Sequence, residues 1–165
     1  MKMSDWSEKR KIVVAFIVAF LVVGALIAVI SSIPTSQEIE RRSLEGAVRE
    51  GSPEFEALTK KISIANDDDN TLESPTALGT ITMALSGRIR NMTGKTITGL
   101  EIKVSVVDRM NNPIKEKKLV VVPTQKESLL PEEVMPVRLT IDGFKKEDDR
   151  AMVRWKVTAI KVKED

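Results

Sequence analysis

From Thr80 to Val162 the chain repeats one pattern, in which short stretches of alternating apolar and polar residues are separated by turn-forming residues. An alternation with a period of two places the apolar side chains on one face of a β-strand. Five stretches of this kind begin near Thr80, Leu100, Ile114, Met135 and Val153. A strand with one apolar face has to bury that face against a second layer. The pattern therefore predicts an all-β sandwich over 72–162.

The phase of the alternation predicts which side chains form the core. These are Leu85, Ile89, Leu100, Ile102, Val104, Leu139 and Trp155. Turns are predicted at 91–95 and 108–113, where Asn and Gly favour tight reversals. The last stretch loses its phase near Ala159 and Ile160, which indicates a β-bulge. Residues 62–65 are a further candidate strand.

An apolar run from Ile12 to Ile30 contains no charged residue. At about 1.5 Å per residue, a helix of this length matches the hydrocarbon thickness of a bilayer. The run is longer than the apolar part of a secretory signal and lacks a small-x-small cleavage site, so an anchor is favoured over a cleaved signal. We expect a transmembrane helix over 12–33 after a tail at 1–11.

Basic residues beside the run predict its orientation. Lys2, Lys9, Arg10 and Lys11 precede the run, whereas the next basic residue after it is Arg41. Because basic residues stay on the cytoplasmic side, we expect a single-pass protein with a cytoplasmic N-terminus and the remainder on the other side.

Between the run and the sandwich, residues 34–65 are predicted to be a helical stalk. The T-x-x-E sequence at 35–38 has the form of a capping box, and Ser52 followed by Pro53 is a second helix start. The stalk is interpreted as a spacer, with a partner-binding amphipathic helix as the alternative.

Composition removes several kinds of chemistry. The chain has no Cys, His or Tyr, and therefore no thiol nucleophile, imidazole base or disulfide. Residues 35–79 carry five basic and ten acidic side chains, and 80–165 carry 17 basic and 12 acidic ones. Because these charges nearly balance and aromatic residues are few, nucleic-acid binding, which needs a clustered basic surface with stacking aromatics, is not expected.

The segments LGTITMALSGRIRNMTGKTITGLEIKVSVVDRMNNPIKEKKLVV, LLPEEVMPVRLTI and VRWKVTAIKV together resemble the FxLYD-type family of small immunoglobulin-like domains. The matching positions are Gly87, Ile89 and Asn91 in the first strand and turn, Asp108 with Asn111 and Asn112 in the second turn, and the residues 130–133 in a later turn. Two departures are Val106-Val107, where the family often has Leu-Tyr, and Glu132, where it has a turn glycine.

The resemblance covers about half of the chain and concerns turns and core. It implies an immunoglobulin-like fold and says almost nothing about activity. Bacterial members that look like this chain combine one N-terminal span with a periplasmic sandwich. The resemblance therefore implies a protein of the bacterial inner membrane with its C-terminal domain in the periplasm.

Few side chains suggest a chemical site. Asp67, Asp68 and Asp69 are weak candidates for Ca²⁺ ligands, but they lack the spaced loop that supplies six to eight oxygens, and a solvated loop is the simpler interpretation. Ser86 or Ser105 with Lys103 is a remote candidate for a Ser–Lys pair, since serines on the outer face of a strand are common. No catalytic residue, metal or cofactor is expected.

Two other sets of residues suggest contacts with partners. Ala15, Ala19, Gly24 and Ala28 put small side chains at four-residue spacing, which lets a second membrane helix approach. Lys115, Lys117 and Lys118 form a charged strand edge, which blunts strand-to-strand aggregation; the alternative is a contact with an acidic protein or with lipid headgroups.

The leading hypothesis is a non-enzymatic accessory subunit that makes protein–protein contacts in a larger membrane complex, such as a respiratory or photosynthetic electron-transfer assembly. Its expected partners are the lipid bilayer and other subunits of the complex, with no small-molecule substrate. The alternative is a periplasmic domain that binds or senses a solute or an envelope component, which would require a concave pocket.

Overall fold

The computed structural model describes residues 13, 15–24 and 35–163. The chain divides into two compact units, Met1–Ile39 and Glu40–Asp165. In the first unit, residues 15–24 are helical and their large apolar side chains, such as Phe16 and Phe20, are exposed. The predicted tail at 1–11 and most of the predicted membrane helix (12, 14 and 25–33) lie outside the described residues. Within the described part of the chain, no helix has the length and apolar character needed to cross a membrane.

Helix α2 (Ser36–Ser43) begins where the capping box predicts a start. The Thr35 hydroxyl accepts a hydrogen bond from the Glu38 backbone N–H at 3.4 Å, which satisfies one of the amide groups at the open end of the helix. Glu38 lies in the first turn and Arg41 and Arg42 in the last, the charge order that complements the helix dipole.

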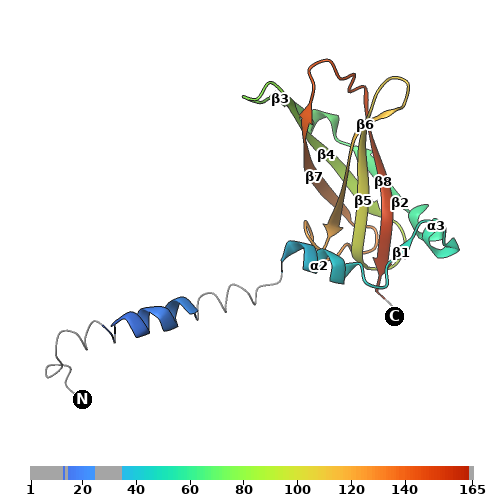
Figure 1. The fold of residues 1–165 in the computed structure, drawn as a ribbon. Helices are drawn as coiled ribbons and strands as arrows, with labels where there is room; N and C mark the ends of the chain where they lie inside the picture. Colours follow the sequence, from blue (N-terminus) through green and yellow to red (C-terminus); the bar gives the residue numbers. More distant parts are fainter. Residues whose placement is uncertain (1–12, 14, 25–34, 164–165) are drawn as a thin grey trace. The chain divides into compact units, whose positions relative to one another are not determined.

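The second unit consists of two antiparallel sheets (Figure 1). In the first sheet the order is β1 (Val48–Arg49), β8 (Met152–Val162), β5 (Ile97–Val107) and β6 (Pro113–Val122). In the second, β4 (Ile81–Asn91) pairs with β7 (Val134–Phe144) along one edge. Its other edge pairs with β2 (Ile62–Asn66) and β3 (Leu72–Pro75) in succession, separated by a short 3-10 helix (Asp68–Asn70).

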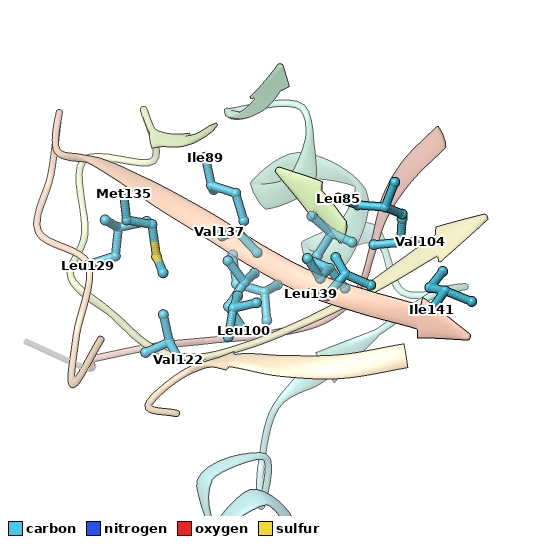
Figure 2. Packing of buried hydrophobic residues seen from close by; sticks show 14 of the residues in the cluster. Leu85, Ile89, Leu100, Val104, Val122, Leu129, Met135, Val137, Leu139 and Ile141 are labelled. Atoms are coloured by element: carbon cyan, nitrogen blue, oxygen red, sulfur yellow. The ribbon is translucent and has the colours of Figure 1, made fainter. Parts of the chain in front are cut away.

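The core lies between the two sheets. Leu85 and Ile89 of β4 and Val137 and Leu139 of β7 face Leu100 of β5, as Figure 2 shows. All are buried because they occupy the inward positions of the alternation. Of the seven predicted core residues, six are buried, and Trp155 is half-buried against the core.

The predicted strands and the β-bulge are confirmed. The register between β5 and β8 shifts between Glu101 and Ile102, so that Thr158 is an extra residue on β8, next to the predicted position. The extra residue lets Val157 and Ile160 both stay buried, although they are three positions apart.

The segment 34–65, predicted as a helical stalk, contains more than helices. Helix α3 (Pro53–Thr59) begins at Ser52, whose hydroxyl accepts from the Phe55 N–H, as predicted. Phe55 is only 3% exposed and belongs to the hydrophobic core, and β1 and β2 are strands of the two sheets. The sandwich therefore includes residues well before 72. The alternation misses β1 because two residues show no period.

Candidate functional site

The three adjacent aspartates do not converge on one point. Asp67 precedes the 3-10 helix, and its carboxylate accepts a hydrogen bond from the Asn70 amide at 3.1 Å and lies 4.0 Å from Arg88. Asp68 and Asp69 lie in the turn itself. Among the described residues, no three acidic, His or Cys side chains are grouped closely enough to hold a metal ion.

Two of the three lysines proposed as partner contacts have partners inside the sandwich. Lys117 on β6 donates from Nζ to the Thr140 carbonyl of β7 at 2.8 Å. Lys115 lies 5.8 Å from the centre of the Phe144 ring, a cation–π distance. Lys118 belongs to the opposite, outer face of the sheet, beside Lys103. The structure therefore separates these three candidates.

The small residues proposed for helix packing are spread around the helix. Ala15, Ala19 and Gly24 lie in the described helical segment, and Ala28 lies outside the described residues. At about 100° per residue, Ala15 and Ala19 point within about 40° of each other, whereas Gly24 lies about 180° from Ala15. The described part of this set therefore does not form one continuous stripe.

Asn91 begins the sequence N-M-T, which has the form of a glycosylation sequon, but its side chain has a structural role. Its side chain is fully buried, and its amide donates to the carbonyls of Lys95, Leu129 and Leu130 at 2.8–3.0 Å. Its Oδ1 accepts from the Thr93 backbone and hydroxyl. Asn91 thus links three loop carbonyls by hydrogen bonds, and its amide nitrogen already donates to protein acceptors.

The serines considered as nucleophiles also have structural partners. Ser86 donates to the Asn70 carbonyl at 3.0 Å, and Ser105 donates to Glu116 at 2.7 Å. The Glu116 carboxylate also lies 3.0 Å from Lys103, and the hydrogen bonds from Ser105 and Lys103 lower the pKa of Glu116. The three side chains form a polar group on the outer face of the first sheet.

The feature that the sequence did not predict is the free edge of β8. Strand β5 pairs with β8 from Met152 to Val162, but on the other edge β1 pairs only with Ala159 and Ile160. Within the described part of the chain, no strand pairs with the second edge of Met152–Val157. We call this stretch the open edge. It faces β2, which is the near edge strand of the second sheet.

Two hollows follow the open edge. One has a volume of about 480 Å³ and lies between Trp155–Val157, the apolar residues Ile62 and Ile64 of β2, and helix α3. The other, of about 560 Å³, is lined by Arg150–Arg154 together with Asn66, Asp68, Thr71, Glu73 and Met83. Together they border every residue from Arg150 to Val157, and we call them the β8 groove.

Trp155 and Asn66 lie where the two hollows meet. The indole Nε1–H of Trp155 donates to Oδ1 of Asn66, and the Asn66 amide donates to the Val153 carbonyl at 3.4 Å. The indole also lies against the backbone of β4, because a Cβ built on Gly87 would be 3.0 Å from its Cζ2. Glycine at 87 thus makes room for the ring.

Charged side chains flank the groove on the outer face of the first sheet. Lys156 forms an ion pair with Glu50, and this contact raises the pKa of Lys156 and lowers the pKa of Glu50. Arg154 has no carboxylate within ion-pairing distance among the described residues. Lys103 lies directly across from both Lys156 and Lys118, so three lysines form a row across the sheet. Two of these lysines already have carboxylate partners, Lys156 with Glu50 and Lys103 with Glu116. Arg154 is therefore the basic side chain of the open edge that remains uncompensated within the described residues.

At the N-terminal end of β8, Arg150 is held firmly. Its guanidinium donates to both oxygens of Glu73 at 3.0 and 3.2 Å, and hydrogen bonding to Glu73 raises its pKa further. The guanidinium also donates from Nη1 to the carbonyl oxygens of Lys145 and Asp148, each at 2.9 Å. The charges of Arg150 and Glu73 therefore offset each other at this end of the groove.

The arrangement combines a free strand edge, an apolar hollow and charged neighbours of both signs. Sequence reasoning found the strand and the tryptophan but not the groove. The groove depends on which strands pair over long separations, and the alternation within one strand carries no such signal. Comparison with protein families, curated proteins and solved structures found no match for this chain.

Proposed function

We propose that this protein is a non-enzymatic, membrane-anchored accessory subunit whose β-sandwich makes protein–protein contacts within a larger membrane complex. The observation that carries the proposal is the open edge of β8 beside an apolar hollow. Proteins usually protect such an edge, because its unpaired amide groups can pair with another chain. An edge left open over Met152–Val157 is well suited to a contact with another subunit.

The turn chemistry supports an immunoglobulin-like fold for the sandwich. Glu132 has φ 62°, a left-handed conformation, at the position where the FxLYD-type pattern has glycine. Its N–H donates to the Asn91 carbonyl at 2.7 Å, which joins the two turns on which the resemblance rests. In this proposal the sandwich is a recognition module of the immunoglobulin-like kind.

The membrane anchor in this proposal is the predicted transmembrane helix over 12–33, with the N-terminus in the cytoplasm and the sandwich in the periplasm of a bacterium. It is supported by the uncharged run and by the four basic residues before it. Anchoring confines the sandwich near other membrane proteins, which raises its effective concentration and strengthens a weak contact. A respiratory or photosynthetic assembly is the kind of complex we propose.

Purification of the tagged full-length chain from its native membrane in mild detergent tests this proposal. We expect defined integral membrane subunits to be enriched. Replacing residues 12–33 with an unrelated membrane span should weaken their recovery, and deleting 80–165 should weaken it again. Recovery of the chain as a lone monomer would contradict the proposal and would favour the alternative, a periplasmic domain that binds a solute or an envelope component.

A reporter that is active only outside the cytoplasm, fused after Asp165, tests the orientation separately. We expect activity, together with recovery of peptides from the Met1 end in the membrane fraction. A mature N-terminus at or beyond Ser31 would contradict the anchor.

A further inference from the structure

We propose that the open edge of β8 binds an extended segment of a partner protein in which apolar and acidic side chains alternate, and that this segment adds to the first sheet as a new strand. The inference rests on the proposed function and names the chemistry of the partner. Three features of the open edge lead to it: its free backbone groups, the apolar wall of the groove and the basic residues on the outer face.

The backbone groups of the open edge point into the groove. The Val153 carbonyl accepts from Asn66, which lies on β2 and not on β5, so this carbonyl is directed away from the existing ladder. Alternate residues of an antiparallel strand direct their amide groups the same way. Trp155 and Val157 therefore also present their N–H and C=O groups to the groove, since the β-bulge lies beyond them.

The groove favours apolar side chains on one face of the bound segment. Val153, Trp155 and Val157 turn toward the second sheet, and Val157 is buried while the other two are half-buried. Ile62 and Ile64 of β2 form one facing wall, Phe55 and Thr59 of α3 form another, and Glu50 and Glu56 also line the hollow. A bound strand placed next to β8 directs every second side chain into this space, where apolar groups are favoured.

The outer face favours acidic side chains at the positions of the bound segment that point away from the groove. Met152, Arg154 and Lys156 point outward from β8 and are exposed. Lys156 already pairs with Glu50. A residue opposite Arg154 on an added strand would lie on the same face as Arg154, where opposite charges stabilise the pair and like charges oppose it. Arg154 has no ion-pair partner within the described residues, so an acidic residue opposite it meets an uncompensated charge.

The same charges argue against a second copy of this chain pairing through β8. A two-fold antiparallel pairing centred on Trp155 places Arg154 opposite Lys156 of the other copy. Pairing centred on Arg154 or on Lys156 places each of those residues opposite itself. Each arrangement brings two basic side chains directly across from one another, which is unfavourable. A different, acidic partner fits the edge better.

Asn66 occupies the place that the partner strand would take. Its amide donates to the Val153 carbonyl at 3.4 Å, a long bond on an exposed site. A strand N–H in good geometry, near 2.9 Å, replaces this contact favourably. Asn66 therefore holds the edge in the free protein and gives way when the segment binds.

Peptide binding to the full-length chain in detergent micelles tests the inference. The probe is an eight-residue capped peptide that alternates Val and Glu, and the matched control alternates Val and Lys. The chain carries Trp6→Phe, so that Trp155 is the only tryptophan. We expect the acidic peptide to change Trp155 fluorescence saturably and to slow amide hydrogen exchange of Val153, Trp155 and Val157. The basic peptide should bind at least about fivefold more weakly.

Charge reversal on the protein separates the open edge from the rest of the basic face. Arg154→Glu should weaken the acidic peptide about fivefold and strengthen the basic one. Lys118→Glu is the matched control, because Lys118 is exposed on the same face but on β6, two strands away. It should leave both affinities nearly unchanged. Both side chains are exposed, so circular dichroism should show an intact fold.

Equal binding of the two peptides, equal effects of the two variants, or protection of β6 amides in place of β8 amides would each overturn the inference. If the acidic peptide fails to bind while the native chain still enriches membrane subunits, the inference fails and the proposed function stands. If both fail, the interaction role itself is lost.

Discussion

The two lateral sides of the sandwich end in different ways. On the β6–β7 side, Lys117 donates across from one sheet to the Thr140 carbonyl of the other, and Lys115 lies over the Phe144 ring, so that side-chain contacts join the two edges. On the β8–β2 side, a groove remains, and Asn66 makes the hydrogen bonds that cross it. Lysines on an edge strand can therefore protect that edge, because the long side chain reaches the neighbouring sheet and its ammonium group donates to a backbone carbonyl there.

Packing should differ most between the two sides. Phe144→Ala on the β6–β7 side should lower the free energy of unfolding by about 3–5 kcal/mol, because this fully buried ring leaves a cavity. Trp155→Ala should cost less than Phe144→Ala, although it is the larger side chain, because the ring is half-buried beside the groove. Urea unfolding of the full-length chain, followed by circular dichroism, measures both. Equal costs would show that the two sides are packed equally.

Glycine substitutions on the two sides should destabilise the fold for different reasons, by steric contact at Gly87 and by backbone strain at Gly143. Gly87→Ala should destabilise the fold by about 1–3 kcal/mol, because the new methyl group would press on Trp155 and on the Ala65 carbonyl at 3.0–3.2 Å. In the Trp6→Phe background, it should also shift Trp155 emission as the ring moves outward. Gly143→Ala is the control: its φ of 78° strains an alanine, but Trp155 emission should stay the same. A shift in the control alone would contradict the placement of the indole.

The bonds that cross each side should have local effects of similar size. Asn66→Ala removes the acceptor of Trp155 and the donor to Val153, and Lys117→Met keeps the stem but removes the bond to Thr140. Each should cost about 0.5–1.5 kcal/mol. Hydrogen exchange should rise at β8 for the first variant and at β7 for the second. If the Asn66 variant left β8 exchange unchanged, Asn66 would not be holding the open edge.

The smallest effect should appear in acid. The contacts of Glu50 with Lys156, and of Glu116 with Ser105 and Lys103, lower both pKa values below 4.5. The unfolded chain therefore binds more protons near that pH. The stabilisation is present above about pH 4.5 and is lost as the pH falls through the folded values. Glu50→Gln on the β8 side and Glu116→Gln on the β6 strand should each flatten the acid limb of stability, measured as urea midpoints from about pH 7 to 3. An unchanged slope in both variants would contradict the two ion pairs.

Much of the sandwich was predictable because each of its long strands shows an alternation of apolar and polar residues. In β4, β5 and β7, an apolar residue at every second position identifies both the strand and its buried face, as at Leu85, Leu100 and Leu139. The helix starts at Thr35 and Ser52 were readable for the same reason, since a cap depends on a few adjacent residues. Local chemistry of this kind needs no knowledge of the rest of the chain.

Contacts between distant residues were decided only by the tertiary structure. The sequence shows Lys115, Lys117 and Lys118 as one charged group, yet pairing with β5 turns two toward β7 and one to the outer face. Likewise, the alternation predicts Trp155 to be a core residue. Because β1 pairs only with Ala159 and Ile160 and does not extend as far as Trp155, this side chain lies at the border of a groove. The face that a side chain occupies follows from its own strand. The residues opposite that face depend on contacts between distant parts of the chain, such as Asn66 and Trp155, which are 89 positions apart.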